Sequence, residues 1–213
     1  MARKSYQGKD IEITFDGSLC IHARECVTAL PKVFVANAPG DWIQPDEASA
    51  EEIAALAHAC PSGAIQYRPK DGSLAEKPPQ VNRVKVRENG PLAFHADLRL
   101  GGEPSGCRLT LCRCGDSKNK PYCDGTHVEA GFTATGEPES KELVTLEERG
   151  GPLEIQPATD GPLLVSGPLE IMAGTGRAIE RTTKTALCRC GASENKPYCD
   201  GTHTKIGFSS DQR

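Results

Sequence analysis

The sequence of 213 residues predicts an α+β protein, with a small mixed unit at the N-terminus followed by two β-rich repeats. Strand-like and helix-like periodicities both occur before residue 70. Short apolar segments that follow Gly-Pro-Leu turns fill much of the rest. The stretch CRCGDSKNKPYCDGTH at residues 112–127 recurs almost unchanged as CRCGASENKPYCDGTH at residues 188–203. The second half therefore reads as a duplicated unit.

The N-terminal unit begins and ends with strand signals. Apolar and polar residues alternate at Ile11, Ile13 and Phe15, as expected of a half-buried strand, and residues 65–67 give a closing strand. A short helix is expected from about Ala23 to Pro31.

A second helix is predicted just before the third cysteine. Ser49 and Glu52 form a capping-box signature, after which Ile53, Leu56 and Cys60 recur at helical spacing. This spacing predicts that Cys60 lies on the apolar face of the helix.

A linker is expected after this unit. Residues 68–80, RPKDGSLAEKPPQ, are rich in proline, glycine and charge and have no apolar period. We therefore expect an N-terminal domain at 1–70, a linker at 71–84, a first repeat at 85–135 and a second repeat at 136–213.

The repeats read as short strands that lead into the cysteine motifs. Glycine supplies a turn, and proline is tolerated at the first position of a strand. Each repeat is roughly 45 residues long, a size that rarely folds without a metal or a partner. Strands are expected at Leu92–Leu100, Arg108–Cys112, Leu163–Met172 and Arg177–Cys188.

Composition indicates a protein of the cell interior. The N-terminus MARKSYQGKD lacks an apolar signal-peptide core, and no apolar run is long enough to span a membrane. We therefore expect a cytoplasmic protein without a membrane partner. The formal charge of −4 with scattered Lys and Arg argues against nucleic acid as a partner.

Each copy of the motif offers three thiols and one imidazole. Cys112 and Cys114 are alternate residues, so both side chains can reach one metal atom. Cys123 and His127 are four apart, which predicts one face of a helical turn and a second metal atom. A tetrahedral zinc site is the alternative for such ligands. The second copy offers Cys188, Cys190, Cys199 and His203 in the same places.

Both copies resemble the CDGSH, or NEET, iron–sulfur family in full, with Thr in place of the Ser of the name. The resemblance implies a [2Fe-2S] cluster in each copy, held by two Cys on one iron and by Cys and His on the other. NEET proteins such as mitoNEET form homodimers with a shared β-cap. The resemblance therefore implies two CDGSH domains packed as an internal pseudo-dimer with a shared β-cap, and a monomeric chain with an internal pseudo-twofold.

A separate cysteine set comprises Cys20, Cys26 and Cys60. Bacterial ferredoxins use a Cys-x-x-Cys-x-x-Cys run and a distant Cys-Pro, but Ala23 occupies the middle position here. Three thiolates suit a [3Fe-4S] cluster, and a [4Fe-4S] cluster with a non-cysteine ligand is the alternative, for which His22 is the nearest side chain. CIHAREC and CPSGAIQY resemble the divergent single-cluster ferredoxin domain over residues 8–70, which implies a ferredoxin-like N-terminal domain.

These features point to electron transfer rather than enzymatic catalysis, because no convincing nucleophile, general-base pair or phosphate loop is present. The expected partner is a redox protein or an apo-protein that accepts a cluster. Cluster storage or transfer, redox or pH sensing, and a zinc-stapled interaction module are the alternative functions. Cys107 belongs to none of the three ligand sets.

Overall fold

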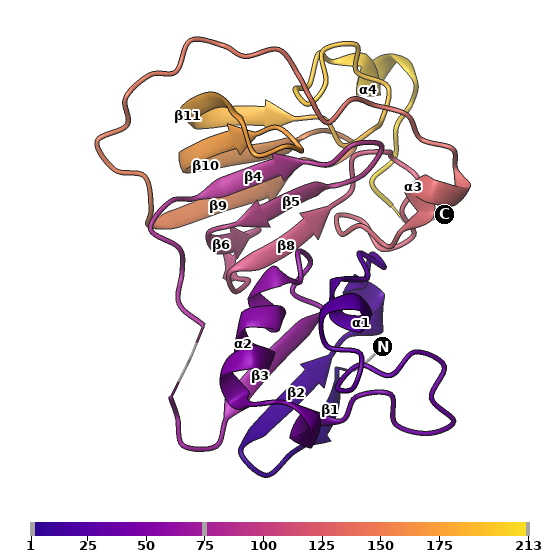
Figure 1. Ribbon diagram of the computed structural model, residues 1–213. Coiled ribbons are helices and arrows are strands. Elements are labelled where there is room, and N and C mark those ends of the chain that lie inside the picture. The colour runs from indigo at the N-terminus through magenta and orange to yellow at the C-terminus, as the bar shows by residue number, and fades with distance from the viewer. Residues whose placement is uncertain (1–2, 74–75, 212–213) are drawn as a thin grey trace. The chain divides into compact units, whose positions relative to one another are not determined.

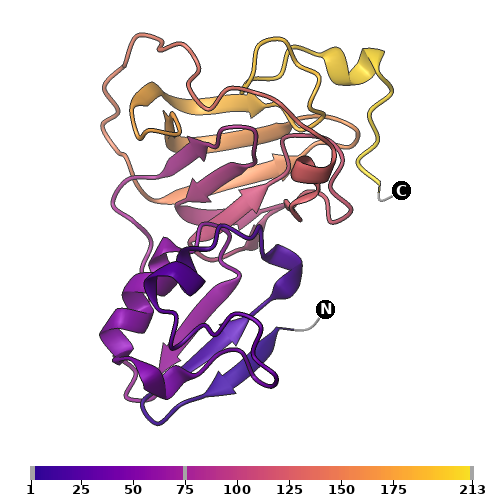
Figure 2. The same cartoon turned by 45° about the vertical axis from the view of Figure 1, so that its right-hand side comes forward.

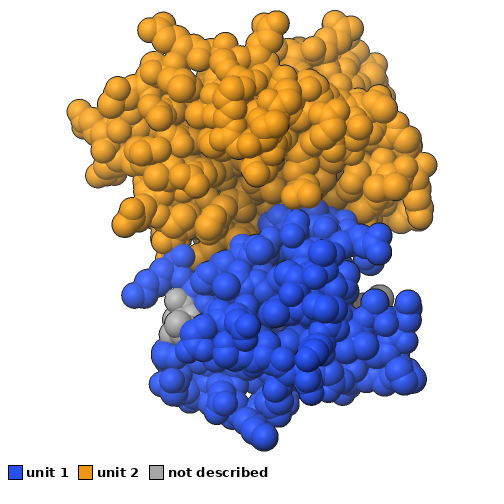
Figure 3. Space-filling view, in the orientation of Figure 1, with its two compact units in different colours: residues 1–77 blue, residues 78–213 orange. Residues whose placement is uncertain are grey.

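The computed structural model describes residues 3–73 and 76–211, and the chain forms two compact units, residues 1–77 and 78–213 (Figures 1 and 3). The division falls inside the linker expected at 71–84. Each unit has its own apolar core. Among the helices of the described ranges, none has the length and apolar character of a membrane span.

The N-terminal unit is a three-stranded antiparallel sheet with helices packed against it (Figure 1). Alternation along the central strand buries Ile11 and Ile13 in a core that also contains Phe34 and Ile53. The strands are β1 (Lys4–Gln7), β2 (Ile11–Phe15) and β3 (Ile65–Pro69), in the order β1-β2-β3. The helices are α1 (Glu25–Ala29) and α2 (Ala50–Ala59), with 3-10 turns at Gly17–Leu19 and Pro45–Glu47.

The two helices of this unit differ in how well the sequence located them. The capping box of α2 is confirmed, since Ser49 Oγ accepts from the Glu52 amide at 3.2 Å and Glu52 accepts from the Ser49 amide at 2.9 Å. Cys60 lies at the C-cap, just beyond the helix. The helix expected from Ala23 begins at Glu25, because Arg24 has a φ of 66°, which no α-helix accommodates.

The C-terminal unit is a single eight-stranded sheet in which strands of the two repeats interleave (Figures 1 and 2). The order is β7-β6-β9-β10-β4-β5-β8, and β11 also pairs with β10. The first repeat supplies β4 (Arg83–Val86), β5 (Leu92–His95), β6 (Asp97–Leu100), β7 (Glu103–Pro104), β8 (Arg108–Leu111) and α3 (Thr126–Glu129). The second supplies β9 (Pro152–Pro157), β10 (Leu163–Met172), β11 (Ala178–Leu187) and α4 (Thr202–Lys205).

One of the two long strand predictions matches the structure and the other does not. The strand expected at Leu163–Met172 is β10, with the same bounds. The one expected at Leu92–Leu100 divides at Ala96, because β5 pairs with β8 of its own repeat whereas β6 pairs with β9 of the other. The sequence analysis did not identify β1, β4 or β9, whose extended conformation depends on distant partners.

The exchange between the repeats is reciprocal. Strand β4 runs parallel to the end of β10, with Arg83 opposite Glu170. Strand β9 runs parallel to β6, with Glu154 opposite Arg99. Each repeat therefore contributes its first strand to the other, and the two repeats enclose one core.

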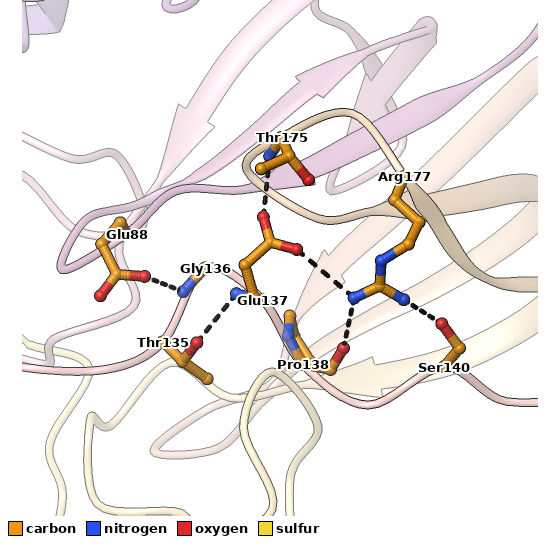
Figure 4. A network of polar contacts seen from close by, with 8 residues as sticks. All are labelled: Glu88, Thr135, Gly136, Glu137, Pro138, Ser140, Thr175 and Arg177. Carbon is orange, nitrogen blue, oxygen red and sulfur yellow. Dashed lines mark hydrogen bonds and ion pairs between the residues drawn. The ribbon is translucent and has the colours of Figure 1, made fainter.

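The segment that joins the repeats is tied across the sheet (Figure 4). Glu137 accepts from the Thr175 amide at 2.9 Å and pairs with Arg177 at 3.4 Å, in the turn between β10 and β11. Arg177 also donates to the Pro138 carbonyl at 3.2 Å, and the Gly136 amide donates to the Glu88 carboxylate. These contacts position the backbone of residues 134 and 135 beside the first cysteine motif.

Candidate metal centres

The donors of the first motif lie in two close pairs. The sulfurs of Cys112 and Cys114 are 3.6 Å apart, and Cys123 Sγ lies 3.4 Å from His127 Nδ1. Two sulfurs about 2.3 Å from one tetrahedral metal atom are about 3.8 Å apart, and a sulfur and an imidazole nitrogen are about 3.6 Å apart. Each pair therefore has the separation of two ligands on one metal atom.

The second motif repeats this arrangement. Cys188 Sγ and Cys190 Sγ are 3.8 Å apart, and Cys199 Sγ lies 3.4 Å from His203 Nδ1. Within residues 3–73 and 76–211, no three Cys, His, Asp or Glu side chains converge as a single metal ion would require. Donors grouped in twos fit a binuclear centre better than a mononuclear zinc site with four ligands.

The Cys–His pairs meet by a turn rather than on a helix face, so the predicted local structure was wrong although the predicted proximity was right. Helix α3 begins at Thr126, after Gly125 in the left-handed conformation with φ 89°, and Cys123 lies outside it. Asp124 holds the turn, because its carboxylate accepts from the Thr126 amide at 3.0 Å and from the Lys118 amide at 2.8 Å. Asp200 makes the same two contacts in the second motif.

An arginine between the two cysteines of each motif fixes the loop to the sheet. Arg113 is 1% exposed, and its guanidinium donates to the carbonyls of Arg87, Gly90, Ala134 and Thr135. The sequence analysis missed this role, although an Arg in both copies of Cys-Arg-Cys was the available signal.

The second arginine makes fewer contacts. Arg189 donates to the carbonyls of Gly161, at 2.9 Å, and Ala158, at 2.5 Å. The rings of Phe132 and Phe208, which follow the two histidines, lie 5.4 Å from the guanidinium carbons of Arg113 and Arg189. Each aromatic ring thus stacks on the arginine of its own motif.

The two cysteine loops pack directly against each other. A Cβ added at Gly115 would lie 2.5 Å from the Cys190 carbonyl oxygen, and one added at Gly191 would collide with the Cys114 carbonyl oxygen. Both glycines also have positive φ, 91° and 81°. Only glycine therefore permits this contact, which makes the two candidate centres neighbours.

In the first motif, the surroundings of the pair formed by Cys112 and Cys114 favour the thiolate form of Cys112. A hydrogen bond from Cys114 lowers the pKa of Cys112 to about 6, helped by backbone amides such as that of Gly115, which donates to Cys112 Sγ at 3.3 Å. Burial raises the pKa of Cys123 to about 12. Burial also lowers the pKa of His127, which keeps the imidazole neutral and able to bind metal.

The arginines place positive charge near both motifs. Burial lowers the pKa of Arg113 to about 10, and the charge of Cys188, in the other motif, opposes that shift. Burial likewise lowers the pKa of Arg189, against the charge of Cys112. Each guanidinium therefore lies within electrostatic reach of a thiolate in the opposite motif.

The N-terminal cysteines surround a more open site. Cys20, Cys26 and Cys60 are all half-buried and line a cavity of about 490 Å³, which His22 also lines. Burial is the main cause that raises the pKa values of Cys20 and Cys26, and the charge of Cys60 raises both further. Three thiols that line one cavity form a set of soft donors for a metal centre.

The two-unit fold and the paired thiol and imidazole donors are the features of a metal-binding protein. Known proteins identify the class further. The family model described as "Divergent 4Fe-4S mono-cluster" matches residues 6–70, and the one described as "Iron-binding zinc finger CDGSH type" matches residues 71–128 and 160–204. The chain therefore carries a domain of the divergent 4Fe-4S mono-cluster type, followed by two segments of the CDGSH iron-binding type. It is an iron–sulfur protein.

Two relatives are similar to about a third of the chain. "Uncharacterized protein YjdI" of Escherichia coli (strain K12) is 35% identical over 68 residues, which are 32% of this chain and 87% of the relative. The protein of the same name in Escherichia coli O157:H7 gives the same values. No solved structure matches the chain.

Proposed function

We propose that this protein is an electron carrier with two [2Fe-2S] clusters and one [3Fe-4S] or [4Fe-4S] cluster. The observation that carries the proposal is the grouping of donors in twos at both CDGSH motifs, 3.4–3.8 Å apart. Such clusters, when bound, accept and release single electrons at potentials set by their ligands and surroundings.

The proposed ligands are those of the sequence analysis. Cys112, Cys114, Cys123 and His127 would hold the first [2Fe-2S] cluster, and Cys188, Cys190, Cys199 and His203 the second. Cys20, Cys26 and Cys60 would hold the third cluster, whose nuclearity depends on whether a fourth ligand such as His22 takes part. The cavity beside these three thiols supports that assignment.

We also propose that the two repeats form an internal pseudo-dimer with a shared β-cap. The reciprocal pairing of β4 with β10 and of β9 with β6 supports this arrangement. The close contacts of Gly115 with Cys190 and of Gly191 with Cys114 support it as well. A chain that supplies its own partner in this way is expected to be monomeric, and its cysteine usage suits the cytoplasm.

The chain's own residues favour electron handling over bond-making chemistry. The residues around the motifs exclude water, since Cys112 is 0% exposed. Arg113 and Asp124 fix the cysteine loop through hydrogen bonds to its backbone and to neighbouring carbonyls. We therefore propose no enzymatic activity, and a redox protein as partner.

Cluster delivery is the second candidate, favoured by the partial exposure of the two candidate histidine ligands. His127 and His203 are half-buried, whereas Cys112 and Cys188 are fully buried. An acceptor protein would therefore reach the Cys–His side first. Transfer of iron and sulfide to an apo-ferredoxin without a reductase would favour delivery.

The deciding experiment is the iron, zinc and acid-labile sulfide content of anaerobically purified protein, with optical and EPR spectra before and after dithionite. Electron transfer predicts sulfide in amounts close to iron and reversible reduction. Zinc without sulfide would contradict the proposal and leave a zinc-stapled interaction module.

A further inference from the structure

A cavity of about 300 Å³ leads to one of the candidate ligands of the second motif. Residues 115–118 and Lys120 of the first motif form one wall, and residues 206–209 form the other. Cys190 also lines it. The cavity is therefore a route from the surface to the second centre, with walls from both repeats.

The cavity wall carries excess positive charge and an exposed apolar side chain. Lys118 and Lys120 contribute two ammonium groups, and Asp116 contributes one carboxylate. Ile206, on the opposite wall, is 52% exposed. An exposed apolar side chain beside charged groups resembles the apolar centre and polar rim of a protein interface.

The related positions on the other side of the paired motifs lack both features. Ala192 and Glu194 replace Asp116 and Lys118, while Lys196 matches Lys120. Ala130 takes the place of Ile206. The internal duplication thus supplies a matched comparison in which the donor distances agree but the side chains at these positions differ; the exposed apolar residue nearest to Ala130 is Val128, which is 74% exposed.

We infer that the face formed by residues 115–120 and 206–209 is a docking site for an acidic electron-transfer protein, which exchanges one electron with the second centre. Positive charge there speeds the encounter with an acidic partner. A small interface suits a transient redox encounter. One redox group loses the electron that the other gains, and no bond forms or breaks. The inference rests on the proposed function.

The first test maps the docking of an anion by NMR. Hexacyanochromate(III) broadens amide signals near its binding site, and hexacyanocobaltate(III) is the diamagnetic control of equal charge. Broadening at residues 116–120 and 206–209 is expected to exceed that at 192–196 and 130–133 by at least about 3-fold in low salt, where charges act over roughly 30 Å. Equal broadening at the two sets of residues would overturn the inference. Broadening that does not depend on Lys118 would indicate an adventitious ion only and would overturn it as well.

Two charge reversals form the matched pair of variants. Lys118→Glu is expected to reduce the broadening at this face by about 3- to 10-fold, given the usual size of electrostatic steering. Glu194→Lys, at the related position, is expected to change the broadening at the face formed by residues 115–120 and 206–209 by less than about 2-fold. Lys118→Gln provides a milder variant if the reversal disturbs folding. Equal responses to Lys118→Glu and Glu194→Lys would contradict the asymmetry.

The second test distinguishes a protein partner from a small anion. An acidic plant-type ferredoxin serves as the probe, and its electron exchange with the protein is followed by stopped flow. Lys118→Glu and Ile206→Ser are both expected to slow the exchange by at least about 3-fold in low salt. Anion broadening that depends on Lys118, without any response to the ferredoxin, would overturn the assignment of a protein partner.

The two proposals fail in different ways. Iron and sulfide content and reversible reduction are measured for each variant beforehand. Protein without reducible clusters would refute the proposed function, whereas the NMR map would still report whether this face binds anions. Reducible clusters with symmetric broadening would refute only the docking site.

Discussion

The two CDGSH motifs are nearly identical in sequence and in donor geometry, yet the fold supports them differently. Arg113 in the first motif donates to four backbone carbonyls, whereas Arg189 in the second donates to two. The additional carbonyls, of Ala134 and Thr135, belong to the segment that joins the repeats. Donor spacing is therefore a local property of the motif, and the rigidity of each centre depends on what surrounds it.

A second contrast separates both motifs from the N-terminal site. The inner thiols of the motifs are already 3.6 and 3.8 Å apart, while the three N-terminal thiols stand around a cavity of about 490 Å³. The inner cysteines Cys112 and Cys188 are fully buried, whereas the three N-terminal cysteines are half-buried. The open site is expected to exchange ligands more readily.

Removing one ligand gives the largest expected effect. Cys112→Ser should remove the first centre, about two iron atoms per chain, and Cys188→Ser the second, because the remaining donors cannot complete a binuclear site. Iron and sulfide analysis with EPR checks this. Cys60→Ser is the comparison that should spare both CDGSH centres. Loss of both centres from either CDGSH variant would show that the loops assemble as one unit.

Gly115→Ala tests the contact between the loops. Positive φ alone costs about 1–2 kcal/mol for alanine, and the collision with the Cys190 backbone should bring the loss of unfolding free energy to more than about 3 kcal/mol. Gly125→Ala is the matched control, since its φ is 89° but nothing lies within 4 Å of its added Cβ. Urea unfolding measures both. Equal losses would mean that the loops separate at little cost.

Arg113→Met and Arg189→Met sharpen the contrast between the motifs. Arg113→Met removes four hydrogen bonds, two of them to the Gly90 and Thr135 carbonyls, for which no other donor is seen in the described residues, and should cost about 3–5 kcal/mol of unfolding free energy. The loss for Arg189→Met should be smaller, about 1–3 kcal/mol, because two carbonyls are affected. Chemical denaturation of the two variants gives the ratio of their losses of unfolding free energy. A larger loss of unfolding free energy for Arg189→Met would contradict the idea that the additional contacts of Arg113 stabilise the first motif more.

A buried carboxylate in the second repeat gives an effect similar in size to that of Arg189→Met. Glu170 is 4% exposed and accepts from Arg149 at 2.6 Å and Arg181 at 2.7 Å, whereas Arg99 stands exposed at the related place in the first repeat. Despite burial, which acts in the opposite direction, these bonds hold the pKa of Glu170 below its usual value. Glu170→Gln should cost about 1.5–3 kcal/mol at pH 7.

The pH dependence of this effect has a defined sign. Because the folded-state pKa of Glu170 is lowered, its stabilisation is complete above about pH 5 and is lost as the pH falls through the folded-state value. The difference in unfolding free energy between wild type and Glu170→Gln should therefore shrink on acidification. A difference that grows toward low pH would contradict the ion-pair account.

The sequence by itself determined the features that local chemistry controls. The capping box at Ser49 and Glu52, the strand at Leu163–Met172 and the close donor pairs of both motifs depend on residues close together in the chain. The proximity of Cys123 and His127 was also predictable, although the turn at Gly125 that produces it was not. Short-range spacing limits how far apart two donors can lie.

Only the tertiary structure decided how the repeats combine. The exchange of β4 and β9, the division of the expected strand at Ala96 and the role of Arg113 all depend on segments far apart in the chain. A strand's partner is selected by packing and backbone pairing across the whole sheet, which short-range periodicity does not encode. The same is true of the contact at Gly115, where the glycine is visible in the sequence but the opposing Cys190 backbone is not.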